Sequence, residues 1–101
     1  MVTTEKVFLE SINYESTVTG RWILGSDYIS DKQYYVAYEI LEDGGKKLFK
    51  MDAEKTIIYD ILKENDTAYL EIEKNGNGVI KAMRLYVTDG TIVRDYDLSL
   101  D

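Results

Sequence analysis

The chain of 101 residues contains no cysteine, no histidine and no proline. Without cysteine, disulfide bonds and thiolate nucleophiles are excluded, and without either Cys or His the usual zinc ligands are missing. The lack of histidine removes the side chain that most often transfers protons near neutral pH. We therefore expect no catalytic residue, no metal site and no cofactor, and we predict that the protein is not an enzyme.

The sequence also lacks an apolar run near the roughly 20 residues that a membrane-spanning helix needs. Its first ten residues, MVTTEKVFLE, carry no long apolar segment typical of a signal peptide, so we expect a cytoplasmic protein. A length of 101 residues predicts a single domain, residues 1–101.

Positive charge is scarce as well. The chain has 12 basic and 19 acidic residues, which gives it a net charge of −7. Duplex nucleic acid is an unlikely partner for such a chain because phosphate binding needs a cationic surface. A protein partner, and a basic one in particular, is electrostatically easier to attract.

What the chain does contain is short segments rich in Val, Ile, Tyr and Thr, separated by Gly, Asn and Asp. This pattern of strands and turns predicts a mostly β domain. A two-residue loop at Gly44-Gly45 would place Tyr38 opposite Met51 and Glu39 opposite Lys50. Because side chains alternate along a strand, this register predicts that Tyr34, Val36, Tyr38 and Ile40 face the core with Phe49 and Met51. Tyr35 would point outward, with Leu41, Leu48 and Lys50.

Two further turns, at Asn77-Gly78 and Asp89-Gly90, predict a meander at the end of the chain. The first turn pairs Tyr69 with Tyr86 and Glu71 with Arg84, and the second would bring Arg84 opposite Asp95. An earlier turn near Glu15-Ser16 would pair Leu9 with Trp22. The residues expected to face the core on the meander are Ala68, Leu70, Ile72, Met83, Leu85, Val87, Ile92 and Tyr96.

One segment departs from strict alternation. Ile57, Ile58, Ile61 and Leu62 have helical spacing, and Asp52 can cap the N-terminus, so the sequence predicts a short helix over 53–64. The expected fold is a small antiparallel β-barrel of about six to seven strands with this one helix. The segment 33–88, with YYVAYEI and TIIYDILKENDTAYLEIEK, is similar in layout to the OB-fold, a barrel with a helix before its last strands.

The candidate binding face lies on the outside of the meander, where tyrosines provide contact area at low entropy cost. It comprises Tyr69, Tyr86, Glu71, Glu73, Asp95 and Asp97. These residues predict a non-catalytic protein-interaction module with an acidic, tyrosine-bearing sheet face. One form of it would inhibit a nucleic-acid-handling enzyme by occupying the cationic groove of that enzyme.

Two alternatives remain open from the sequence. The OB-like layout implies a binder of single-stranded nucleic acid or of a glycan, through a ligand face made of Tyr35, Leu41, Leu48 and Lys50. The third hypothesis is a structural or self-associating domain in which Leu41 and Leu48 form a homodimer contact. The sequence does not decide between the three.

Overall fold

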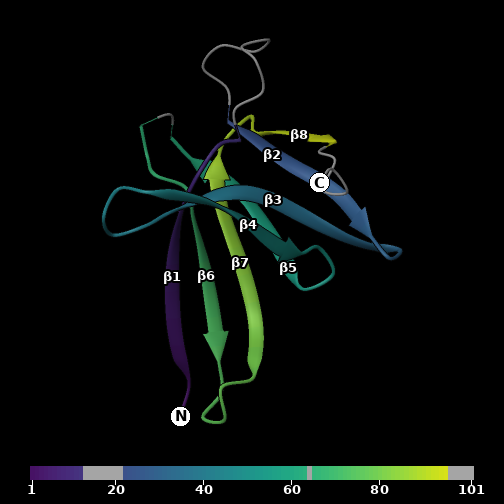
Figure 1. Ribbon diagram of the computed structural model, residues 1–101. Coiled ribbons are helices and arrows are strands. Elements are labelled where there is room, and N and C mark those ends of the chain that lie inside the picture. Colours follow the sequence, from purple (N-terminus) through teal and green to yellow (C-terminus); the bar gives the residue numbers. More distant parts are fainter. Residues whose placement is uncertain (13–21, 64, 96–101) are drawn as a thin grey trace.

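The computed structural model of the chain describes residues 1–12, 22–63 and 65–95. Within these residues the chain forms eight strands (Figure 1). They are β1 (Thr3–Glu10), β2 (Ile23–Ile29), β3 (Lys32–Ile40), β4 (Lys46–Asp52), β5 (Thr56–Leu62), β6 (Tyr69–Lys74), β7 (Ile80–Thr88) and β8 (Ile92–Asp95). The prediction of a mostly β fold is confirmed.

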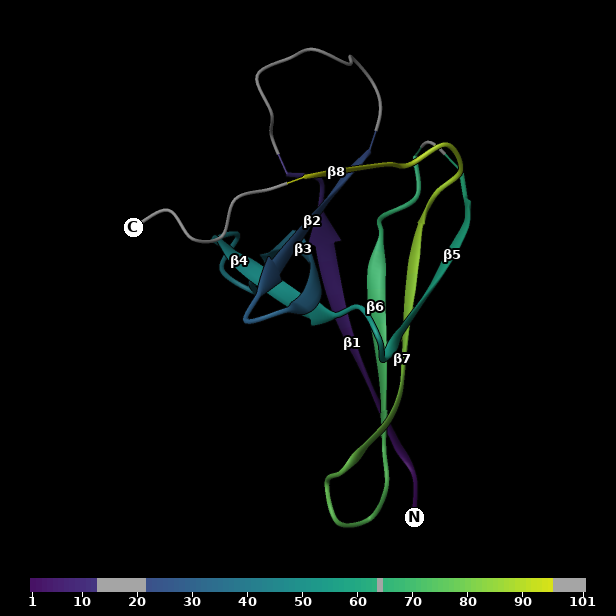
Figure 2. The same cartoon turned by 90° about the vertical axis from the view of Figure 1, so that its right-hand side faces the viewer.

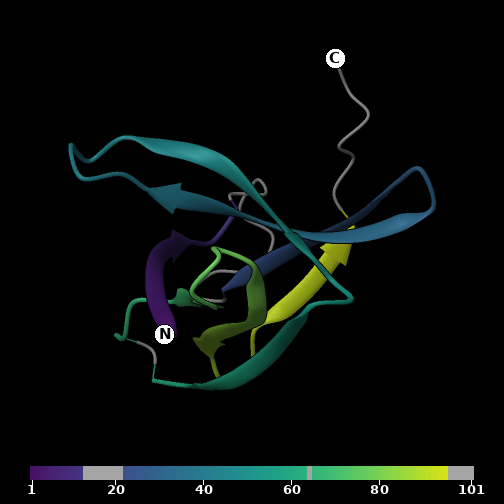
Figure 3. The same ribbon diagram turned by 90° about the horizontal axis from the view of Figure 1, so that it is seen from below.

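The strands form one strongly bent sheet in the order β5-β7-β6-β1-β3-β2-β8, and β4 pairs with the other edge of β3. We call the half made of β5, β7, β6 and β1 sheet A, and the half made of β4, β3, β2 and β8 sheet B. Strand β1 joins the halves, because Thr3–Phe8 pair with β6 whereas Leu9 and Glu10 pair with β3. Figures 2 and 3 show the result, a sheet that curls around its inner face like half of a barrel.

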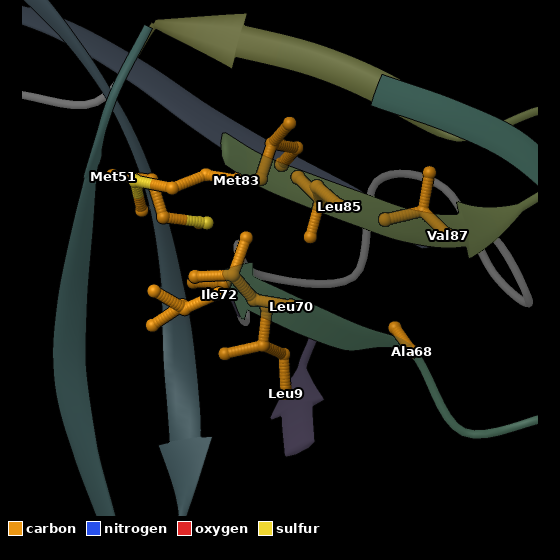
Figure 4. Packing of buried hydrophobic residues seen from close by; sticks show 10 residues of the cluster. Leu9, Met51, Ala68, Leu70, Ile72, Met83, Leu85 and Val87 are labelled. Carbon is orange, nitrogen blue, oxygen red and sulfur yellow. The ribbon is translucent and has the colours of Figure 1, made fainter. Parts of the chain in front are cut away.

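Apolar side chains from both halves fill the space inside the curl (Figure 4). The buried cluster consists of Leu9, Leu24, Ala37, Met51, Ala68, Leu70, Ile72, Met83, Leu85 and Val87. Six of the eight core residues predicted for the meander are among them, because alternation along β6 and β7 sends every second side chain inward. The side chain of Ile92 and all of Tyr96 lie outside what the structure describes.

The prediction of a helix over 53–64 is wrong. Thr56–Leu62 form β5, which pairs in parallel with β7. The capping signal at Asp52 is real but serves one turn only: its Oδ1 accepts the N–H of Glu54 at 3.0 Å, and its carbonyl accepts the hydroxyl of Thr56 at 2.7 Å. The isoleucines then follow their preference for extended backbone. Because the helix was the feature that suggested an OB-like layout, that resemblance loses its support.

The sheet is not entirely antiparallel either, since β5 pairs in parallel with β7 and β8 pairs in parallel with β2. A turn does form at Asp89-Gly90, where the N–H of Thr91 donates to the carbonyl of Thr88 at 3.0 Å. The predicted hairpin beyond it is nevertheless wrong, because β5 occupies the edge of β7 that β8 would need. The chain therefore passes over to β2.

The register predicted for β3 and β4 is wrong by three positions. Tyr35, not Tyr38, lies opposite Met51, and Glu39 lies opposite Lys47. The loop is longer than two residues: the N–H of Leu41 donates to the carbonyl of Gly45, and Gly44 adopts a φ of 88°. A shift by an odd number exchanges the two faces of a strand.

The exchange moves Tyr35 inward, beside Phe49, whose predicted inward position is confirmed, and both pack against the main core. Val36 and Tyr38 instead face the outer side of sheet B and pack in a second cluster with Ile12 and Ile23. The predicted pairing of Leu9 with Trp22 is wrong, since Leu9 lies opposite Glu39. The turn predicted near Glu15-Ser16 lies outside the described residues.

Candidate functional site

Four aromatic side chains lie side by side on the outer face of sheet A, one on each of its four strands. The rings of Tyr69 and Tyr86 stack with centroids 4.8 Å apart, and Tyr86 stacks in turn on Tyr59 at 5.1 Å. Phe8 meets Tyr69 edge-on at 6.4 Å. We call the set Phe8, Tyr69, Tyr86 and Tyr59 the aromatic row.

Strand register places these four residues together. Phe8 lies directly opposite Tyr69, Tyr69 opposite Tyr86, and Tyr86 opposite Tyr59. Neighbouring strands lie about 4.8 Å apart, so aromatic rings on directly opposed residues lie within stacking distance of one another. The predicted pairing of Tyr69 with Tyr86 and of Glu71 with Arg84 is confirmed.

At its centre the row presents ring edges and hydroxyl groups rather than ring faces. Both faces of Tyr86 are occupied by its neighbours Tyr59 and Tyr69. The hydroxyls of these three tyrosines donate no hydrogen bond to any residue that the structure describes, and Phe8 is 47% exposed. A base or a sugar ring would need an open ring face to stack on, whereas a protein surface can pack against edges and accept hydrogen bonds from the hydroxyls.

A charged row lies next to the aromatic one. Arg84 donates from Nε to Glu71 at 2.8 Å and from Nη2 to Glu73 at 3.1 Å, and the two carboxylates raise the pKa of its guanidinium. Lys6 holds its ammonium group 4.6 Å from the centre of the Tyr69 ring, a cation–π contact. The two glutamates are thus compensated by two cations, and the face is close to neutral.

The phenol of Tyr86 has a raised pKa, first because burial disfavours the phenolate and second because Glu71 is near. A group whose folded pKa is raised contributes stability below its unfolded pKa and loses it as the pH rises through the folded pKa. We therefore expect the free energy of unfolding to fall above about pH 10, and to fall less steeply in Tyr86→Phe. Urea unfolding at about pH 8 and about pH 11 measures this difference. Equal losses in both proteins would contradict the prediction.

The structure brings together only part of the predicted binding set. Tyr69, Tyr86, Glu71 and Glu73 share the outer face of sheet A. The backbone of Asp95 lies in β8, which pairs with β2 in sheet B, so it is not opposite Arg84. Asp97 lies outside the described residues.

The alternative ligand face is divided by the corrected register. Tyr35 lies on the inner side of sheet B opposite Met51, whereas Leu48 and Lys50 lie opposite Tyr38 and Val36 on the outer side. Leu41 begins the loop that follows β3. The four residues do not form one surface.

Phe8 and Tyr59 belong to the row but were missed by sequence reasoning. Phe8 shares its strand face with the charged residues Lys6 and Glu10, which already indicates that it points outward. What the sequence did not reveal is that β1 pairs with β6, more than 60 residues away. Tyr59 was assigned to a helix. Its position between Ile58 and Asp60 in a segment rich in β-branched residues was the signal for a strand.

A hollow of about 350 Å³ opens beside the Phe8 end of the row, between β1 and the loop after β3. Its lining is Lys6, Val7, Phe8, Glu39, Ile40, Leu41 and Glu42. A second hollow of about 340 Å³ opens near the other end, next to Ile57 of β5. The ridge of rings therefore has a hollow near each end.

Comparison with known proteins gives no significant match to a family model, to a curated protein or to a solved structure. Among the described residues, no three acidic side chains gather closely enough to hold a metal ion. No described helix is long and apolar enough to cross a membrane.

Proposed function

We propose that this protein is a non-catalytic interaction module that binds a protein partner through the outer face of sheet A. The aromatic row is the observation that carries the proposal. Four rings in register across four strands form a continuous contact surface, while the core residues on the opposite face keep the sheet rigid. Tyrosine is enriched in interface cores because its ring and hydroxyl contribute at low entropy cost.

The arrangement of the rings favours a protein over a nucleic acid or a glycan. Tyr69 and Tyr86 stack on one another, while Tyr59 covers the second face of Tyr86 and Lys6 lies over the Tyr69 ring, so neither offers a free face to a base or sugar. The net charge of −7 repels a phosphate backbone. The same charge attracts a basic partner over a distance, although the local balance of Glu71 and Glu73 with Arg84 leaves the contact itself to the rings.

A nucleic-acid-handling enzyme is a partner of this class, since its substrate groove is cationic. Inhibition would follow if the acidic module occupied that groove. This narrower form of the proposal predicts binding that weakens steeply as salt concentration rises, because long-range attraction between opposite charges is screened.

The experiment is a quantitative pull-down that compares the wild type with Tyr69→Ala/Tyr86→Ala. We expect proteins retained by the wild type to be lost from the double variant, because two central rings are removed. The matched control is Tyr28→Ala, which removes an equally large ring from β2, where it is 63% exposed and far from sheet A. Circular dichroism verifies that each variant is folded.

A partner that binds both variants equally well would show that this face is not the interface. If the central double variant does not fold, Phe8→Ser/Tyr59→Ser tests the same row from its two ends. Repeating the capture at high salt separates the electrostatic contribution from that of the rings.

A further inference from the structure

Strand β5 is an edge of the sheet whose second side pairs with no described strand. Its sequence, TIIYDIL, is rich in isoleucine, and Ile57 and Ile61 are 56% and 67% exposed. An edge strand exposes unpaired backbone N–H and C=O groups, so it can pair with another extended segment. The aromatic row ends on this same strand, at Tyr59.

The other described edge with placed side chains, β4, is built differently. It carries Lys46, Lys47 and Lys50 within seven residues. Lysines on an edge strand oppose the docking of another strand because their charges would lose water. No lysine interrupts β5, so of these two edge strands β4 is protected and β5 is open.

The hollow next to Ile57 adds a place for a side chain. Strand β7 begins at Ile80, but β5 begins at Thr56 opposite Met83, so Ile80–Ala82 extend past the end of β5. The resulting hollow of about 340 Å³ is lined by Glu54, Lys55, Ile57, Ile80, Lys81, Ala82 and Met83. In strand addition the backbone gives affinity, and pockets for side chains give specificity.

We infer that the open edge of β5 receives an extended, basic segment of the protein partner as an additional strand of sheet A. This inference rests on the proposed function and specifies how the partner binds. The segment would place apolar side chains beside Ile57 and Tyr59. It would also place a lysine or arginine near Asp60, the only charged residue within β5. The side chain of Asp60 is exposed and makes no ion pair with a described residue.

A second copy of the chain fits this edge less well. Antiparallel self-pairing centred on Tyr59 would place Lys55 opposite Lys63 of the second copy, and Asp60 opposite an isoleucine. Like charges directly opposite one another destabilise a strand pair. The approach would also join two chains that each carry a charge of −7.

The test is a titration of the isotope-labelled protein with a blocked synthetic peptide of about eight residues that alternates valine and lysine, followed by backbone NMR. We expect the amide signals of β5 to shift and hydrogen exchange at its outward N–H groups to slow by about tenfold. Ile57→Lys and Asp60→Lys should each abolish this response. Leu48→Lys is the matched control, because Leu48 is an exposed leucine on the protected edge strand β4.

A peptide that alternates valine and glutamate should give no response. An equal response to both peptides, shifts centred on β4, or no shift in β5 would overturn the inference. Protection of β5 that increases with protein concentration without peptide would assign the edge to a second copy instead. If the amide signals of β5 do not shift while Tyr69→Ala/Tyr86→Ala still abolishes partner capture, only the strand-addition mode is contradicted and the proposed function stands.

Discussion

Replacing Leu70 with alanine is expected to lower the free energy of unfolding by about 3 kcal/mol. Leu70 is fully buried at the centre of sheet A, between Val7 of β1 and Leu85 of β7. Its side chain points into the space between the two halves of the sheet, among the other buried apolar side chains of the core (Figure 4). The loss therefore combines the transfer of the removed methyl groups with the cost of the void.

The measurement is urea unfolding followed by circular dichroism. Leu48→Ala serves as the control, because the same chemical change on the outer face, where the leucine is 41% exposed, should cost less than about 1 kcal/mol. A loss at Leu70 no larger than the loss at Leu48 would mean that the two sheets do not enclose a common core.

A disulfide between positions 39 and 47 is expected to form readily and to raise the free energy of unfolding by about 2–3 kcal/mol. Glu39 lies directly opposite Lys47 across β3 and β4. Opposed residues of antiparallel strands have Cα atoms about 4.5–5.5 Å apart, within the range that a disulfide spans. The native chain has no cysteine, so Glu39→Cys/Lys47→Cys can form no competing bond.

The decisive comparison is Glu39→Cys/Lys50→Cys, which joins the residues that a two-residue Gly44-Gly45 loop would oppose. Three positions along a strand separate Lys47 from Lys50, about 10 Å, so this pair should remain reduced. Mass spectrometry after mild oxidation, and unfolding with and without reductant, give the result. Faster oxidation of the Glu39→Cys/Lys50→Cys pair would support the two-residue loop and contradict the register described above.

The difference between these registers shows where reasoning from sequence reaches its limit. The hairpin of β6 and β7 was predicted correctly, even though its turn is not the expected two-residue one. The N–H of Asn75 donates to the carbonyl of Val79, and a bulge between Glu73 and Lys74 then restores the predicted pairing. The loop after β3 has the same hydrogen-bond pattern, with Gly44 in the place of Gly78, but no later bulge corrects its register.

Partners distant in sequence could not be predicted from local pattern. The helical spacing of Ile57, Ile58 and Ile61 is also compatible with a strand when one residue forms a bulge, as occurs between Asp60 and Leu62. Only the pairing of β5 with β7 decides between the two. The aromatic row has the same origin: its central pair came from one hairpin, but Phe8 and Tyr59 joined it through pairings of high sequence separation.

The sharing of β1 between the two sheets has a consequence for the order of folding. Sheet A cannot complete its β1 side until β6 has been synthesised, although β1 is the first strand of the chain. During synthesis, Val7 therefore has no strand partner until most of the chain has been made, whereas Leu9 can pair with β3, and β2, β3 and β4 can pair locally, much earlier. Closing such long loops late makes a chain fold slowly for its size. We expect Thr3–Phe8 to acquire stable hydrogen bonds only after β6 has formed, and the joining of the two halves of the sheet through β1 to be a slow step of folding.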